Sequence, residues 1–264
     1  MAQRDISKAL RFRKQPQGFD AQKFAEVLEN AYLSQRRETK YTQKTTFSPS
    51  SIGYGKATCA RYWYHAFTGA EFDESATDAL GVANMSYGTD AHARIEGLLE
   101  EAGVLLDKEV EITLEDPPVR GYADVLVDWP GIGEVIGEIK TTRQESFVIR
   151  QATMKPATYH MYQILLYMKA RNKKIGFLLY ENKNDQSFLV IPVEWNAKNE
   201  AYLEDALQWL RLVRRAWEAG EVPNRGFPTA RNKNCRECPV RATCWAEDAP
   251  EHTVTIPLME TPRL

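Results

Sequence analysis

The order of apolar and polar positions along the chain predicts alternating helices and strands. Apolar residues recur with a helical period in five segments, at 20–37, 59–69, 82–102, 156–171 and 198–219. Five strand-like runs stand at 108–114, 121–128, 134–141, 174–180 and 187–193. From the helical segment at 82–102 onward this succession predicts an α/β or α+β sheet flanked by helices, of which we expect the α/β class.

The two ends of the chain differ in pattern from its middle. In the segment 20–37, Asp20 is a candidate N-cap, and an apolar stripe follows on one helical face: Phe24, Val27, Leu28 and Ala31. We therefore expect a helical extension and polar linker at 1–47, a folded domain at 48–245 and a loose tail at 246–264.

Composition excludes several classes of protein. Hydrophobic residues make up 43% of the 264 positions and charged residues 27%, as in globular proteins and unlike disordered or collagen-like chains. No run approaches the roughly 18 apolar residues of a membrane helix. The first residues lack the apolar core of a secretory signal. We expect a cytoplasmic protein without a membrane segment.

Charge is strongly segregated along the chain, although the net charge is only −2. Residues 1–47 carry ten Lys or Arg against five Asp or Glu, and residues 139–245 carry eighteen against ten. Residues 71–138 carry three against seventeen. The basic segments favour a polyanion such as nucleic acid, and solvated surface charge is the alternative explanation.

A hairpin at residues 121–142 brings two acids together. WPGIG is a turn signal, and a hairpin centred on Gly131 places Asp124 opposite Glu138, about 5 Å away. Two carboxylates at that distance repel, so a cation is expected between them. Lys140 shares their face, while the other face is apolar: Val125, Val127, Val135 and Ile139. A solvated face with an ordinary Glu–Lys pair is the alternative.

Two further patterns flank this hairpin. His92 lies on one helical stripe with Ile95, Glu96 and Leu99, as either a core histidine or a metal ligand. Gln163 and Tyr167 lie one helical turn apart, which packing alone would also explain.

Together these residues resemble the PD-(D/E)XK nuclease superfamily, specifically its RecB-like exonuclease branch. That pattern is a His on the first helix, then G-x-x-D, E-x-K and Q-x-x-x-Y. The chain has these in order as His92, Gly121-Tyr-Ala-Asp124, Glu138-Ile-Lys140 and Gln163-Ile-Leu-Leu-Tyr167, with Ala123 in place of Pro before the Asp. The resemblance implies a restriction-endonuclease-like αβββαβ core with a central mixed sheet.

The resemblance also implies roles for these residues. His92, Asp124, Glu138 and the carbonyl of Ile139 would hold one or two Mg²⁺ or Mn²⁺ ions, for which carboxylate oxygens are suitable ligands. Lys140 would orient the attacking water and stabilise the transition state. Gln163 and Tyr167 would position the strand that is cut.

The four cysteines form a second constellation: Cys59, Cys235, Cys238 and Cys244. A C-x₂-C pair with a third Cys nearby is typical of metal ligation, and disulfides are rare in cytosolic proteins. The arrangement of one ligand far upstream of three resembles the iron–sulfur RecB-like nucleases, which include CRISPR-associated adaptation exonucleases and AddB-type nuclease domains. It implies a [4Fe–4S] cluster; zinc and free thiols are the alternatives.

We therefore expect a DNA exonuclease acting on single strands or free ends, in phage or prokaryotic replication, recombination or CRISPR adaptation. The segment from Ser50 to Ala57 lacks the glycine and hydroxyl residue of an ATP-binding loop. The protein would then act without ATP or beside a helicase, recombinase or integrase. The competing hypotheses are a non-catalytic module that binds DNA ends or assembles a complex, and a zinc-stapled hydrolase.

Overall fold

The computed structural model describes residues 20–34, 43–73 and 78–260, and the chain divides into two compact units. The first unit comprises Met1–Thr39 and Ala76–Tyr87. Its helix α2 spans Ala21–Ser34, and the Asp20 carboxylate accepts backbone hydrogen bonds from Gln22 and Lys23, so the predicted N-cap is confirmed. The predicted continuation of this helix to residue 37 lies outside the described residues.

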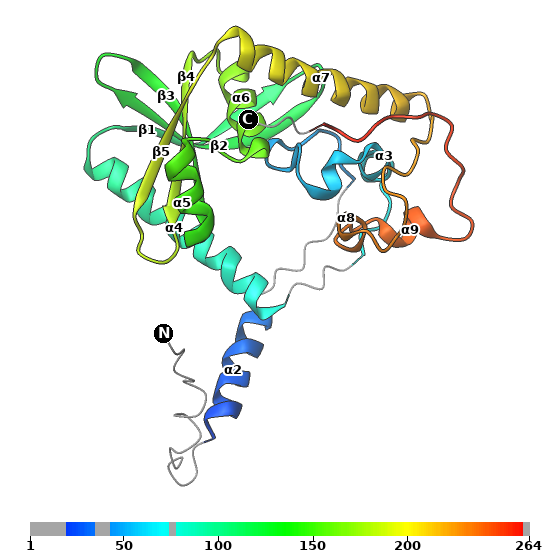
Figure 1. The fold of residues 1–264 in the computed structure, drawn as a ribbon, viewed down its shortest axis with the longest axis horizontal. Coiled ribbons are helices and arrows are strands. Elements are labelled where there is room, and N and C mark those ends of the chain that lie inside the picture. The colour runs from blue at the N-terminus through cyan, green and yellow to red at the C-terminus, as the bar shows by residue number, and fades with distance from the viewer. Residues whose placement is uncertain (1–19, 35–42, 74–77, 261–264) are drawn as a thin grey trace. The chain divides into compact units, whose positions relative to one another are not determined.

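The second unit is built on a five-stranded sheet in the order β1-β2-β3-β4-β5 (Figure 1). The strands are β1 (Leu105–Leu114), β2 (Val119–Trp129), β3 (Gly133–Thr142), β4 (Ile175–Asn182) and β5 (Phe188–Glu194). Only β3 and β4 pair in parallel. A parallel pair needs a crossover connection, which the helices α5 (Gln144–Thr153) and α6 (Thr158–Ala170) supply. The predicted α/β class and mixed sheet are confirmed.

Helices cover both faces of the sheet. The C-terminal half of α4 (Ala79–Glu101) places Ile95 in a buried cluster with the predicted apolar face of the hairpin: Val125, Val127, Val135 and Ile139. The larger core on the opposite face includes residues of α6, of α7 (Ala197–Glu218) and of α3 (Ala60–Thr68). The hairpin of β2 and β3 is therefore enclosed between α4 and α6.

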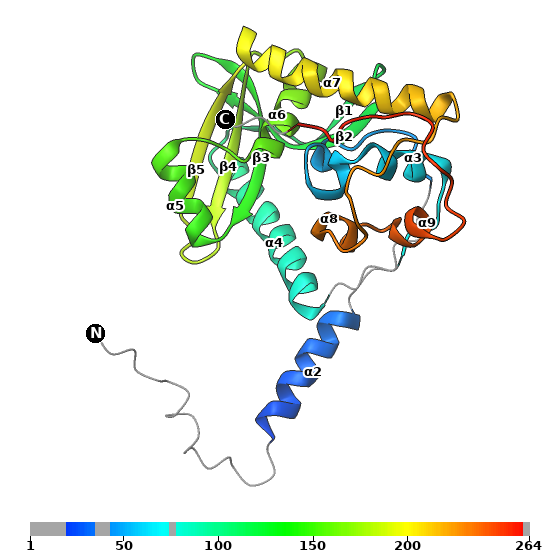
Figure 2. The ribbon, with the colours of Figure 1, turned by 45° about the vertical axis from the view of Figure 1, so that its right-hand side comes forward.

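Short helices from two distant parts of the chain lie together beside the sheet, on the right in Figures 1 and 2. They are η1 (Pro49–Ser51), η2 (Gly55–Thr58), α8 (Lys233–Arg236) and α9 (Arg241–Trp245), next to α3. The buried Arg61 guanidinium of α3 donates hydrogen bonds to the carbonyl oxygens of Pro223 and Pro250, at 2.9 and 2.7 Å. These bonds tie the segment around Cys59 to the C-terminal part of the chain.

The predicted loose tail at 246–264 is wrong for its described part, residues 246–260. Ile256 and Met259 are buried, at 4% and 5% exposed. The Trp209 indole donates to the Pro257 carbonyl at 2.8 Å, and the Met259 amide donates to the Thr58 carbonyl at 2.8 Å. Two buried side chains three positions apart, in a segment that contains Pro257, are too few to establish a period, so the hydropathy signal was too weak to predict this docking.

Two further sequence predictions need correction. Phe47, assigned to the polar linker, is fully buried and bridges Val119 of β2. Helix α5 was not predicted, since Phe147 is its only buried residue and leaves no apolar stripe. No helix among the described residues is long and apolar enough to cross a membrane.

Candidate active site

The candidate active site lies where β2 and β3 stop pairing. The ladder runs from Trp129–Gly133 to Val125–Gly137, which is the register predicted for a hairpin centred on Gly131. Asp124 and Glu138 come next and do not form the ladder pair that the sequence predicted. Instead, the Asp124 carboxylate accepts a hydrogen bond from the Ile139 backbone amide at 2.6 Å. A side-chain oxygen of β2 is thus a partner of the β3 backbone just beyond the last ladder pair.

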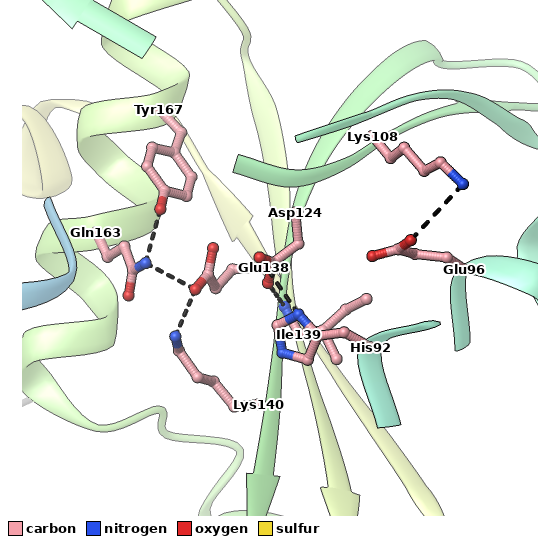
Figure 3. Close-up of polar contacts among 9 residues, drawn as sticks. All are labelled: His92, Glu96, Lys108, Asp124, Glu138, Ile139, Lys140, Gln163 and Tyr167. Carbon is pink, nitrogen blue, oxygen red and sulfur yellow. Dashed lines mark hydrogen bonds and ion pairs between the residues drawn. The ribbon is translucent and has the colours of Figure 1, made fainter. Parts of the chain in front are cut away.

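Glu138 is the buried centre of a hydrogen-bond network (Figure 3). Only 2% of the residue is exposed, and one carboxylate oxygen, Oε1, accepts from Lys140 Nζ and from Gln163 Nε2, the latter at 2.7 Å. The Gln163 amide also donates to the Tyr167 hydroxyl at 2.6 Å. The other oxygen, Oε2, is buried and has no hydrogen-bond partner. A buried carboxylate oxygen without a partner is costly unless a ligand completes it.

Gln163 and Tyr167 lie behind Glu138. They are 3% and 1% exposed, so neither offers a surface to a substrate strand. The resemblance implies that they position the strand being cut. In this geometry any such influence passes through the orientation of the Glu138 carboxylate.

His92 approaches Asp124 from α4, with Nδ1 lying 3.5 Å from Asp124 Oδ1. The imidazole side chain is 30% exposed, which sets it apart from a core histidine. Burial lowers the pKa of His92, although the negative charge of Glu138 raises it in part. The neutral ring therefore predominates at neutral pH. The neutral form is the one that binds a metal ion.

The two carboxylates are held in an unfavourable environment. Burial raises the pKa of both Asp124 and Glu138, and the negative charge of Asp124 raises that of Glu138 further. Lys140 opposes both shifts. Glu96 adds a third negative charge that raises the pKa of Asp124; the sequence placed Glu96 on the His92 stripe without assigning it a role.

The donor set suits a hard divalent cation, because two carboxylates and an imidazole are neighbours here and one buried carboxylate oxygen lacks a partner. Within the described ranges, however, no three His, Cys, Asp or Glu side chains stand close enough to hold a metal ion as they are placed. Cation binding would therefore have to draw these side chains together.

Asp124→Asn is expected to stabilise the metal-free protein by up to about 1 kcal/mol, because it removes one of two buried carboxylates that repel each other. A divalent ion that binds only the folded state raises the melting temperature by mass action. Mn²⁺ should therefore stabilise the unmodified protein and stabilise the variant much less. The measurement is a melt of both proteins with chelator and with Mn²⁺. A variant that melts lower in chelator and responds equally to Mn²⁺ would show that the two carboxylates do not share a metal site.

The four cysteines line one cavity, together with basic residues. Cys59 lies at the start of α3, Cys235 on α8, Cys244 on α9, and Cys238 in the segment between α8 and α9. The cavity measures about 20 Å³, more than the roughly 10–15 Å³ that one water molecule requires. Lys56, Arg225 and Arg241 contribute positive charge to its lining. The constellation expected from the sequence is thus assembled around a space that protein atoms do not fill.

Burial in the cavity favours the protonated form of Cys235, Cys238 and Cys244. Burial raises the pKa of Cys238 to about 12, and it also raises the pKa of Cys235 and Cys244. The neighbouring Cys59 raises all three further. Thiolates are the ligating form, so a metal group bound here must displace protons. The positive charge of its metal ions would favour the thiolate form, as the neighbouring Lys and Arg side chains already do in part.

A protein-family model described as the PD-(D/E)XK nuclease superfamily matches residues 93–245, more than half of the chain. No curated protein matches significantly. Among solved structures, SSO0001 is 15% identical with a TM-score of 0.44, covering 85% of this chain and 97% of its own. An alkaline exonuclease (LHK-Exo) from Laribacter hongkongensis is 15% identical with a TM-score of 0.47, covering 74% and 95%. Its complex with dAMP is 17% identical with a TM-score of 0.47, covering 74% and 93%.

Proposed function

We propose that this chain, which belongs to the PD-(D/E)XK nuclease superfamily, is a metal-dependent DNA exonuclease of the RecB-like iron–sulfur type. The observation that carries the proposal is the environment of Glu138. Its carboxylate is buried, bonded to Lys140 on one oxygen and without a partner on the other, and it lies beside the Asp124 carboxylate. A buried acid of this kind, next to a second acid and a lysine, is suited to cation-assisted hydrolysis of a phosphodiester.

Each residue of the site has a distinct proposed role. Mg²⁺ or Mn²⁺ would be held by His92, Asp124, Glu138 and the Ile139 carbonyl. The bound ion supplies a water of lowered pKa and offsets charge on the phosphate. The Lys140 ammonium orients the attacking water and stabilises the negative charge that develops on the phosphate oxygens. Gln163 fixes the Glu138 carboxylate by its 2.7 Å hydrogen bond, and Tyr167 fixes the Gln163 amide.

The cysteine cavity supports a cluster better than a single zinc ion. All four thiols line the cavity, and one ligand stands far upstream of the other three, an arrangement that resembles the iron–sulfur RecB-like nucleases. Zinc needs its sulfur ligands about 2.3 Å away, whereas a [4Fe–4S] group spreads its four thiolates over separate iron atoms. We therefore propose a [4Fe–4S] cluster held by Cys59, Cys235, Cys238 and Cys244. Its function would be to join the two ends of the domain.

We propose DNA as the substrate, with the reaction confined to chain ends. The basic excess of residues 139–245 supports a polyanionic substrate. The nuclease domain is proposed to extend beyond the expected residues 48–245 at both ends, because Phe47, Ile256 and Met259 are buried in its core. A helicase, recombinase or integrase remains the predicted kind of partner, because the chain has no ATP-binding loop of its own.

Linear and covalently closed circular DNA test the exonuclease proposal. With Mn²⁺, the purified protein should degrade linear strands labelled at the 5′ or the 3′ end and leave closed single-stranded circles of the same sequence intact. Cleavage of circles would contradict an end-dependent mechanism. Binding of ends without any cleavage would favour the competing non-catalytic module. An anaerobic preparation that is colourless and contains zinc would favour the zinc-stapled hydrolase.

A further inference from the structure

One face of α6 leads from the buried site toward the surface. Tyr159, Gln163 and Tyr167 are spaced four residues apart, so they share this face. Tyr167 and Gln163 are buried, and Tyr159, in the first turn of the helix, is partly exposed. Since the Gln163 amide contacts Glu138, Tyr159 is the next side chain outward from the candidate active site.

A second set of contacts places Tyr159 beside Lys140. Lys140 of β3 is paired in register with Tyr180 of β4, and the Tyr180 hydroxyl lies 2.8 Å from His160 Nδ1. The His160 and Tyr159 rings meet edge to face, with centroids 4.3 Å apart. The positive charges of Arg150 and Lys140 also act on Tyr159, opposing the rise in its pKa that burial causes.

Tyr54 continues this aromatic row at the surface. Its ring centroid lies 4.7 Å from that of Tyr159, and 57% of the residue is exposed. The flanking Gly53 and Gly55 have φ angles of 75° and 51°, and a Cβ at Gly53 would lie 2.6 Å from the Tyr162 ring. These positions favour glycine, and the turn that they form presents the Tyr54 ring to Tyr159.

An open cavity of about 370 Å³ adjoins Tyr54 on the side of α8. Its volume falls within the roughly 300–1,000 Å³ of pockets that hold small ligands. The polar lining includes Thr58, Lys233, Asn234 and Glu237. A lysine ammonium and an amide beside an exposed aromatic ring suit a nucleotide, whose phosphate is anionic and whose base presents a flat face.

We propose that Tyr54 is a stacking platform for an unpaired nucleobase of the substrate strand, close to the phosphodiester that is cut. The adjoining cavity receives the neighbouring nucleotide. This inference rests on the proposed nuclease function and adds a substrate class, because a base inside a duplex cannot offer its face to a side chain. The protein would therefore require a single strand at this position whatever the sequence of bases.

The test pairs substitutions at Tyr54 with removal of single bases from the DNA. Three proteins are compared, with Tyr54 unmodified, Tyr54→Phe or Tyr54→Ala. Each also carries Lys140→Ala to prevent cleavage. Binding of a labelled single-stranded oligonucleotide is measured by fluorescence anisotropy with Mn²⁺, while one abasic site is moved along the strand. Trp129→Ala is the matched control, since Trp129 is a similarly exposed aromatic residue, 54% accessible, at the far end of the hairpin.

One abasic position should weaken binding about fivefold or more when residue 54 is Tyr or Phe, and should have little effect with Tyr54→Ala. Trp129→Ala should retain the abasic effect. An equal abasic effect in all chains, or none in any, would overturn the stacking platform. Cleavage by chains that keep Lys140 tests the nuclease itself. Absent cleavage together with a preserved Tyr54–base effect would therefore contradict the proposed function and still support the platform.

Discussion

Lys140→Ala is expected to abolish cleavage while DNA binding remains nearly unchanged. The Lys140 ammonium contacts the buried Glu138 carboxylate and is itself partly exposed, at 24% of its side chain. A donor that acts on charge formed in the transition state contributes to kcat and little to ground-state binding. Losing such a donor costs about 10²–10³ in kcat. The measurement is single-turnover cleavage of labelled DNA, with binding measured in parallel by anisotropy.

Lys173→Ala is the matched control for this substitution. Lys173 also pairs with a glutamate of β3, namely Glu134, at the opposite end of the strand, where Glu134 is exposed. Exposed ion pairs contribute little to stability, so this variant should cleave at the unmodified rate. If Lys140→Ala keeps more than a small fraction of activity, or if both variants lose it equally, the assignment of Lys140 is wrong.

Cys238→Ala is expected to damage folding more than chemistry. It removes one of four ligands from a centre that joins Cys59 to Cys235, 176 positions further along the chain. Closing a loop of that length contributes about 4–5 kcal/mol to stability, and the binding energy of a structural metal group is also folding energy. The variant should be colourless, deficient in iron and sulfide, and prone to aggregation.

The measurement is iron and sulfide content, visible absorbance and melting temperature after anaerobic purification. Thr243→Ala is the control, because Thr243 is exposed on α9 next to the ligand Cys244. That variant should keep the colour and the melting temperature of the unmodified protein. A soluble Cys238→Ala protein with full brown colour and an unchanged melting temperature would exclude the four-cysteine cluster.

The hairpin shows how far local pattern predicts this fold. The turn centred on Gly131 and the alternation of valines gave the correct register and the correct buried face. Both follow from chain geometry alone, since residues in a hairpin pair by their distance from the turn. Helix α5 and the docking of Ile256 depend instead on tertiary packing, which leaves little periodic signal in a short polar segment.

In the candidate site, too, local spacing predicts some contacts, and others depend on tertiary packing. Spacing predicted that Lys140 would share the face of Glu138, and that Gln163 and Tyr167 would lie together. The bond from the Ile139 amide to Asp124 was not predictable, because the strand pattern specifies backbone pairs and not a side-chain oxygen as the partner of a backbone amide. Tyr54 reaches Tyr159 from a distant segment, and no local pattern connects the two residues.

Glu138→Gln provides the most direct test of the central claim, that the carboxylates beside Lys140 form a cation-dependent nuclease centre. End-labelled single-stranded DNA is incubated with Mn²⁺ or with chelator, using the unmodified protein, Glu138→Gln and the control Glu134→Gln from the exposed end of β3. We predict cleavage by the unmodified protein and by Glu134→Gln with Mn²⁺ only, and none by a folded Glu138→Gln protein. Cleavage by Glu138→Gln at the unmodified rate, or cleavage that persists in chelator, would contradict the claim.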